Sequence, residues 1–161
     1  MVEVIDNFLP STIFYNLQKN IMSSEFPWYY NDFILTPRNY EKDYQFTHQF
    51  VNPDTGCQDY YYLIEPCVKQ LRVSNIKRIK ANLNTRTIFH KSGGFHTDYP
   101  NMLTSIFYVN TNNGWTKFKG GDKIKCVENR MVIFDSNIEH SGFSCTNQKR
   151  KIVVNFNYGK N

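Results

Sequence analysis

Several features that would assign this chain of 161 residues to common protein classes are absent from its sequence. No apolar run approaches the roughly 20 residues of a membrane-spanning helix. The N-terminal segment 1–10 carries acidic residues and lacks the basic region of a secretory signal. The four cysteines form no CxxC pair, which argues against a zinc finger. We therefore expect no membrane association and reduced thiols in a cytoplasmic setting.

The charge balance and the composition narrow the class further. Lys and Arg number 19 and Asp and Glu 14, which gives a mild net charge of +5. That excess permits an anionic substrate but is not the dense basic stripe of a dedicated DNA-binding protein. Hydrophobic residues make up 40% of the chain and aromatic residues 16%, so the chain has ample apolar surface for a core that leans towards β-structure. Its length fits one domain, residues 1–161.

The spacing of apolar residues divides the chain into a helical first part and a strand-rich second part. Steps of three and four residues predict a helix from Ser11 to about residue 22 and a second helix over about 57–71. Residues 31–56 show no clean periodicity, and we interpret them as loops with short extended pieces. From residue 76 to residue 158, short apolar segments alternate with turn signals. This order predicts an α+β, mainly β fold with a sandwich or small barrel as its body.

Two of the four histidines stand in a pattern typical of a metal site. In a strand, residues i and i+2 point to the same face, so His96 and Asp98 can reach one metal ion. His140 lies just after a predicted strand, at the start of a turn, and a sandwich could bring it beside His96. Two imidazoles and one carboxylate form the facial triad of non-haem Fe(II) oxygenases. An isolated HxD pair is a weak signal, and on that evidence alone a surface His beside an Asp is the better interpretation.

A lone arginine strengthens the metal hypothesis. Arg150 follows His140 by ten positions and shares its parity with Ile152 and Val154 on an apolar strand. An arginine on an inward strand face needs an anionic partner, because an unpaired buried charge is unfavourable. A ligand carboxylate would fit, held by both arms of the guanidinium. Lys151 has the opposite parity, and we expect it to point outward.

These residues together resemble a known enzyme family. The stretch HTDYPN at 96–101, the strand IFYVN at 106–110, and the later His140 and Arg150 are similar to the motifs of 2-oxoglutarate- and Fe(II)-dependent oxygenases of the prolyl-hydroxylase-like subgroup. The resemblance covers residues 76–158. The small size of the chain and its closing NFNY resemble single-domain members encoded by bacteriophages.

The resemblance implies a fold, a reaction and a set of ligands. The fold would be a double-stranded β-helix, or jelly roll (76–158), with an N-terminal helical elaboration (1–75) packed on one sheet. Fe(II) would be held by His96, Asp98 and His140, and the far carboxylate of 2-oxoglutarate by Tyr108 and Arg150. With O₂, such an enzyme hydroxylates a C–H bond, of a prolyl residue or another amino-acid substrate, and releases succinate and CO₂. Its partner would be a protein, peptide or amino acid, in the host cytoplasm for a phage-encoded member.

Two other functions compete with this one. A cupin-type site of three histidines would add His90 to His96 and His140, but it would leave Asp98 and Arg150 without roles. A non-catalytic metal-binding jelly roll that serves as an interaction module would explain the triad alone. The complete set of three ligands and an arginine favours the enzyme.

The remaining polar residues are less informative. The nucleic-acid demethylase branch of the family carries a second arginine six residues after the first. Here that position is Phe156, which argues against a nucleic-acid substrate. His48 lies in an aromatic region and is either structural or substrate-facing. Asn82, Asn84 and Arg86 share one face of the strand before the HxD motif, where they either line the pocket or face water.

Overall fold

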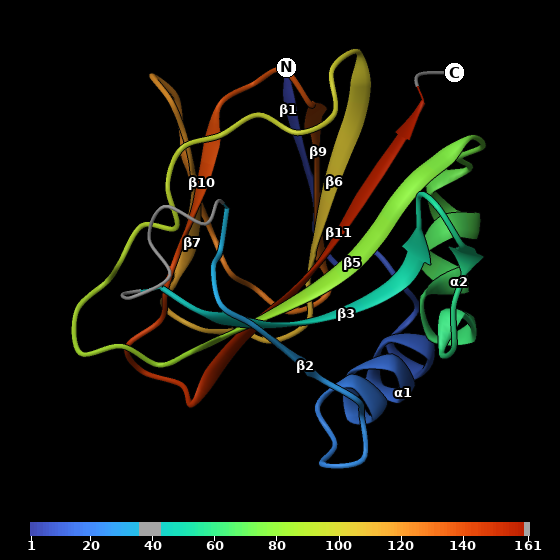
Figure 1. Cartoon of the computed structure of the whole chain (residues 1–161), viewed down its shortest axis with the longest axis horizontal. Coiled ribbons are helices and arrows are strands. Elements are labelled where there is room, and N and C mark those ends of the chain that lie inside the picture. Colours follow the sequence, from blue (N-terminus) through green and yellow to red (C-terminus); the bar gives the residue numbers. More distant parts are fainter. Residues whose placement is uncertain (36–42, 160–161) are drawn as a thin grey trace.

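The structure, a computed structural model, describes residues 1–35 and 43–159 and consists mainly of antiparallel β-structure with two helices (Figure 1). Within these residues the large sheet has the strand order β1-β9-β6-β11-β5-β3-β2, with β4 paired to β3, and the small sheet has the order β10-β7-β8. The large sheet contains β1 (Val2–Ile5), β2 (Tyr29–Asn31), β3 (Gln45–Asn52), β4 (Gly56–Cys57), β5 (Ile76–Thr85), β6 (Met102–Tyr108), β9 (Arg130–Asp135) and β11 (Arg150–Gly159). The small sheet contains β7 (Trp115–Phe118), β8 (Lys123–Lys125) and β10 (His140–Phe143).

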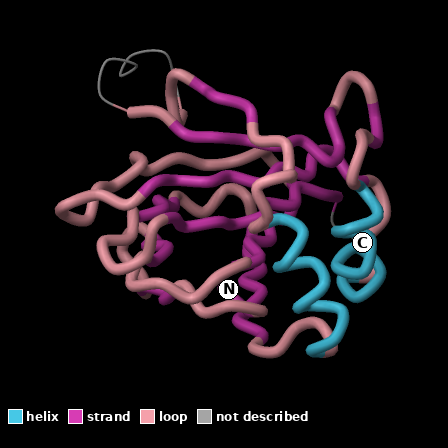
Figure 2. The backbone as a smooth tube through the Cα atoms, turned by 90° about the horizontal axis from the view of Figure 1, so that it is seen from below, coloured by secondary structure: helices cyan, strands magenta, loops and turns pink. Residues whose placement is uncertain are grey.

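One face of the large sheet is covered by helices α1 (Ser11–Ile21) and α2 (Tyr61–Leu71). Figure 2 shows both helices together on one side of the strands. Each helix buries one apolar stripe, because its buried residues recur at three- and four-residue steps. The apolar core between helices and sheet includes Leu17, Ile64, Ile79, Val154 and Phe156.

The opposite face of the large sheet turns towards the small sheet. A second apolar cluster lies between the two sheets and joins Phe118 of β7 to Ile106, Val132 and Val153 of the large sheet. Successive residues of β11 therefore alternate between two buried environments, with Val154 on the helix side and Val153 between the sheets. The predicted mainly β fold with helices packed on one sheet is confirmed.

Two details of the prediction were wrong. The second helix begins at Tyr61, since Gly56 and Cys57 form β4 by pairing with β3. The segment 31–56, interpreted as loops with short extended pieces, contains the eight-residue strand β3, which lies between β5 and the edge strand β2 of the large sheet. The alternation of β3 is broken because the polar His48 stands on its buried face and because a register shift between Gln49 and Val51 leaves two buried apolar residues, Phe50 and Val51, side by side in the sequence. Residues 36–42 of that segment lie outside the described residues.

Neither described helix is long and apolar enough to cross a membrane, since each has 11 residues.

The packing of α1 on the sheet predicts a large stability effect for one side chain. Leu17 is 1% exposed, so Leu17→Ala should lower the free energy of unfolding by about 2–5 kcal/mol through lost burial and a cavity. Urea denaturation followed by circular dichroism measures the change. The matched control is Ile13→Ala, at a position 42% exposed on the same helix, and it should cost no more than about 0.5 kcal/mol. Equal losses for the two variants would contradict the packing of this helix.

Candidate metal centre

The fold brings His96 and His140 directly opposite each other. The backbone N of His96 donates to the carbonyl of His140 at 3.0 Å, and the N of His140 donates back to the carbonyl of His96 at 2.9 Å. This pair of hydrogen bonds is an isolated antiparallel bridge between the segment that precedes β6 and the start of β10. His140 is thus the first residue of a strand, whereas the sequence suggested a turn after one. Backbone geometry, rather than side-chain contact, fixes the approach of the two rings.

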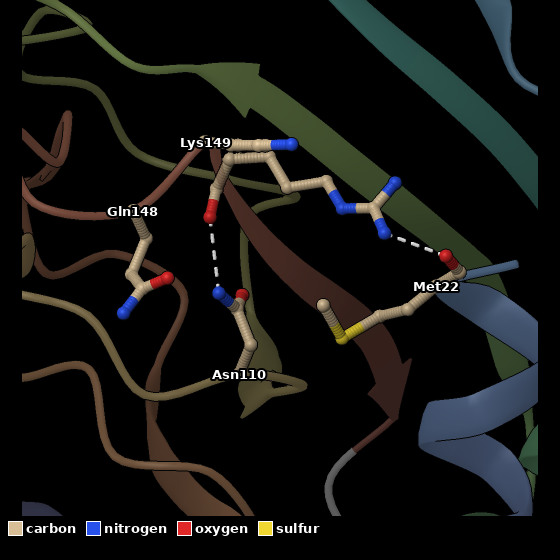
Figure 3. Close-up of a pocket in the computed structure, with 5 residues that line it drawn as sticks. Met22, Asn110, Gln148 and Lys149 are labelled. Carbon is tan, nitrogen blue, oxygen red and sulfur yellow. Dashed lines mark hydrogen bonds between the residues drawn. The ribbon is translucent and has the colours of Figure 1, made fainter.

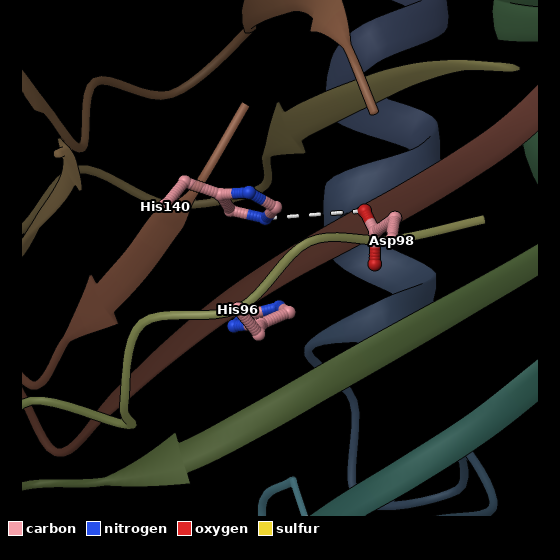
Figure 4. Close-up of side chains that lie close together, drawn as sticks. All are labelled: His96, Asp98 and His140. Atoms are coloured by element: carbon pink, nitrogen blue, oxygen red, sulfur yellow. Dashed lines mark ion pairs between the residues drawn. The ribbon is translucent and has the colours of Figure 1, made fainter. Parts of the chain in front are cut away.

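The side chains of His96, Asp98 and His140 converge at this bridge (Figure 4). One potential ligand atom from each residue lies within 4.8 Å of the others, and His140 Nε2 is 3.9 Å from Asp98 Oδ2. The two imidazole rings have centroids 4.5 Å apart. All three residues therefore offer a donor atom to one shared point.

Both histidines are held in the tautomer that a metal requires. His96 Nδ1 lies 3.1 Å from the carbonyl oxygen of Gly94, and His140 Nδ1 lies 3.0 Å from that of Ile138. A carbonyl only accepts, so each Nδ1 carries the proton and each Nε2 keeps its lone pair free for a cation. Burial lowers the pKa of His140, which favours the neutral ligand form.

The carboxylate of Asp98 is fixed by hydrogen bonds from the large sheet. Thr104 Oγ1 on β6 donates to Asp98 Oδ2 at 2.7 Å, and Asn157 Nδ2 on β11 donates to the same oxygen at 3.2 Å. Arg78 on β5 lies 3.7 Å from Oδ1 and also donates to the side-chain oxygen of Asn157. Three strands thus orient one carboxylate, and that arrangement is typical of the outer shell of a metal site.

Arg150 lies on a different face from the one that its proposed role requires. It shares parity with Ile152 and Val154, as the sequence indicated, but that face packs against the helices. Its guanidinium donates to the backbone oxygen of Met22 at 2.5 Å, beyond the end of α1. Arg150 lines a cavity of about 430 Å³ together with Met22 and Asn110, and Figure 3 labels these two neighbours in that cavity. A cation at a helix C-terminus is stabilised by the helix dipole, which accounts for Arg150 without a ligand.

Lys151 occupies the interior instead, so the expectation that it points outward was wrong. It is 3% exposed, and its Nζ donates to the backbone oxygens of Trp115 and Phe143 on the small sheet. Burial lowers its pKa. No carboxylate of the residues that the structure describes lies within 4.0 Å of this ammonium group. Arg150 and Lys151 do point to opposite faces of β11, as predicted. Alternation alone does not say which of the two buried faces contains the site.

Tyr108 lies on the same face as Lys151. It is fully buried and pairs in register with Val153, two residues from Lys151 along β11. Its hydroxyl donates to Thr116 Oγ1 at 2.7 Å, and burial raises its pKa. The phenol therefore stays protonated and able to donate.

The other two histidines lie apart from the triad. His90 is exposed, its Nδ1 is 2.7 Å from the carbonyl of Ser144, and its ring packs on Trp115. His48 is buried against Phe26 on the helix side, which makes it a structural residue. The three-histidine alternative thus loses its geometric basis, since the described metal-ligand group contains Asp98 and not His90.

Lys80 was not predicted as a site residue, and it shares the face of Asn82 and Asn84 on β5. Burial, with a smaller contribution from the neighbouring Arg78, lowers its pKa to about 8, and Asp98 opposes the shift. Alternation along 78–84 groups Lys80 with Arg78, Asn82 and Asn84 in the sequence, but only the fold shows that Arg78 presents this face to Asp98. Asn82 is buried and Asn84 half-buried, whereas Arg86 is exposed.

No protein-family model matches the chain, and neither does the sequence of any curated protein. The chain does match solved structures. The chain is similar to a viral collagen prolyl hydroxylase from Paramecium bursaria Chlorella virus-1, with a TM-score of 0.62, 14% identity, and coverage of 99% of this chain and 90% of that one. A second similar structure is a Trichoplax adhaerens prolyl hydroxylase in complex with a hypoxia-inducible-factor peptide. Its TM-score is 0.63 at 15% identity, and the match covers 98% of this chain and 83% of that one.

A 2OG-Fe(II) oxygenase family member from Burkholderia pseudomallei gives a TM-score of 0.66 at 9% identity, over 99% of this chain and 86% of that one. Likeness at such low identity establishes a shared fold. The chain therefore has the jelly-roll fold of the prolyl hydroxylases and 2OG-Fe(II) oxygenases to which it is similar.

The placement of Arg150 predicts a structural role for it. Arg150→Ala removes a charged hydrogen bond to the backbone of Met22 and should lower the free energy of unfolding by about 1 kcal/mol. Urea denaturation measures it. Lys149→Ala, at an exposed neighbouring position, is the control and should be silent within about 0.5 kcal/mol. No loss for Arg150→Ala would show that the contact adds nothing to stability.

Proposed function

We propose that the chain is a 2-oxoglutarate- and Fe(II)-dependent oxygenase that hydroxylates a C–H bond of a protein, peptide or amino-acid substrate and releases succinate and CO₂. The single observation that carries the proposal is the convergence of His96, Asp98 and His140, each with a free donor atom, on a jelly roll. The likeness to prolyl hydroxylases, one of them bound to a peptide, supports it. In this proposal residues 1–161 act as one domain.

The donor set suits Fe(II). His96 and His140 would bind through Nε2 and Asp98 through a carboxylate oxygen, a facial arrangement that leaves positions open for other ligands. Bound Fe(II) supplies the redox chemistry that activates O₂. Thr104 and Asn157 keep the carboxylate turned towards the two rings, and the backbone bridge keeps the rings apart at a fixed separation.

We propose Lys151, in place of Arg150, as the residue that binds the far carboxylate of 2-oxoglutarate. A buried ammonium group is unfavourable without an anion, and Lys151 faces the space between the sheets. Tyr108 is its diagonal neighbour across β6 and β11 and can donate to the same carboxylate if it releases Thr116. A non-catalytic metal-binding module would leave the Lys151 charge without a purpose, so the enzyme is the better proposal.

Loss of either histidine should remove metal binding. His96→Ala or His140→Ala should weaken Mn(II) affinity by more than the ~100-fold that outer-shell changes reach, and should abolish succinate production. Isothermal titration calorimetry under anaerobic conditions measures the affinity. His90→Ala is the control and should bind Mn(II) like the wild type. If His90→Ala loses the metal while Asp98→Ala keeps it, the three-histidine site is correct.

Loss of Lys151 should separate co-substrate binding from metal binding. Lys151→Ala should weaken 2-oxoglutarate binding to the Mn(II)-loaded protein by about 2–5 kcal/mol, because the carboxylate loses its charged partner in a buried site. Mn(II) affinity should change little. Arg150→Ala is the control, and calorimetric titration of 2-oxoglutarate compares the two. A loss for Arg150→Ala with none for Lys151→Ala would return the anchor to Arg150.

A further inference from the structure

Three polar side chains beside the triad have unmet interactions. Lys80 and Asn82 lie on β5, and Asn155 lies on β11. They share a face with Arg78 and Asn157, whose contacts with Asp98 place that face on the side of the triad. None of the three has a role in binding the metal or the far carboxylate of 2-oxoglutarate.

The two asparagines lack hydrogen-bond donors. The Oδ1 atoms of Asn82 and Asn155 are buried and accept no hydrogen bond from the described residues, and Asn82 is 8% exposed. Buried polar atoms are nearly always paired, so an unpaired one marks either strain or a missing ligand. Two such oxygens on adjacent strands require two N–H or O–H donors.

Lys80 lacks an anion. Among the described residues, no carboxylate lies within 4.0 Å of its ammonium group, although the residue is half-buried. The neighbouring Arg78 already donates to the Asn157 side chain. Asp98 stabilises the Lys80 cation in part but does not form an ion pair with it, so a negative group from outside would supply the missing partner.

The spacing suits one small molecule. Asn155 pairs directly with Lys80, and Asn82 pairs with Val153 two positions along, so Asn82 and Asn155 are diagonal neighbours. Such side chains have Cβ atoms within about 7–8 Å of one another. The Lys80 side chain is long enough to reach across this span.

The chemistry of the missing ligand follows from these requirements. 2-Oxoglutarate offers only acceptors, so it cannot satisfy the two asparagine oxygens. The main chain of a peptide offers N–H donors but no negative charge for Lys80. An α-amino acid carries both, with three N–H donors on its ammonium group and a carboxylate two bonds away.

We propose that Lys80, Asn82 and Asn155 bind the primary substrate, and that this substrate is a free α-amino acid. Its carboxylate pairs with Lys80, and its ammonium group donates to the oxygens of Asn82 and Asn155. The proposal rests on the proposed oxygenase function and narrows its substrate class. Both oxygens are shielded in the free chain, so binding requires a neighbouring side chain to move, and Lys80 is long enough to do so.

Calorimetry with the twenty common L-amino acids as probes tests the proposal. Each is titrated anaerobically into the full chain loaded with Mn(II) and 2-oxoglutarate. At least one should bind, and its methyl ester and N-acetyl derivative should bind at least ~10-fold more weakly, the equivalent of about 1.4 kcal/mol. Lys80→Met should bind acid and ester alike, whereas the control Lys125→Met, at an exposed position on β8, should keep the wild-type preference.

The outcomes separate this proposal from the function on which it rests. A wild type that binds 2-oxoglutarate but no amino acid overturns the amino-acid substrate and leaves the oxygenase intact. A Lys80→Met variant that loses 2-oxoglutarate instead makes Lys80 a co-substrate residue and also overturns it. A wild type that binds an amino acid but not 2-oxoglutarate supports the amino-acid site and contradicts the oxygenase.

Thermal stability gives a second readout that needs no substrate. Asn82→Leu and Asn155→Leu each remove an unpaired oxygen with little change in shape, so Tm should stay constant or rise while amino-acid binding falls at least ~10-fold. The control is Asn112→Leu, because both ends of that buried side chain are hydrogen-bonded, to Gly114 and Asn110, and its Tm should fall. A fall in Tm for Asn82→Leu and Asn155→Leu would assign the asparagines to the structure and overturn their role in binding.

Discussion

The hydrogen-bonded carboxylate of Asp98 is the interaction on which the candidate site depends. Its side chain is 8% exposed and takes hydrogen bonds from Thr104 on β6 and Asn157 on β11, with Arg78 of β5 nearby. The HxD segment is otherwise tied down by backbone bonds to Ser136 and His140. A loop carrying two ligands is thus fastened to both sheets, so the ligand atoms are held in place before any metal binds. Such preorganisation is what a metal site needs from its surroundings.

Strand alternation then distributes the remaining functions. On β11, the residues on the parity of Val154 pack under the helices, and those on the parity of Val153 face the space between the sheets. The first face supplies stability, and the second supplies Lys151, Asn155 and Asn157 to the site. One strand therefore carries the core and the chemistry on opposite sides, one residue apart.

The sequence was sufficient for the fold class and for the three candidate ligands. The HxD spacing, the later His140 and the helical periodicity from Ser11 to about residue 22 are patterns within the sequence, so they can be recognised without a structure. The sequence could not decide whether Arg150 or Lys151 faces the site. Both faces of β11 are buried, and alternation along a strand does not tell the face that the helices cover from the face between the sheets. The strand β3 was missed for another reason, since the polar His48 on its buried face and the register shift between Gln49 and Val51 interrupt the alternation. Lys80 was missed because its lack of an anionic partner is visible only after folding.

The central claim is that this jelly roll holds a metal ion at His96, Asp98 and His140 with 2-oxoglutarate reaching towards Lys151. The most direct test is anomalous diffraction from crystals soaked with Mn(II) and 2-oxoglutarate. We expect one strong anomalous peak within bonding distance of both Nε2 atoms and the Asp98 carboxylate, with co-substrate density that ends at the Lys151 ammonium group. A peak bound to His90, or no peak at the triad at saturating Mn(II), would contradict the account.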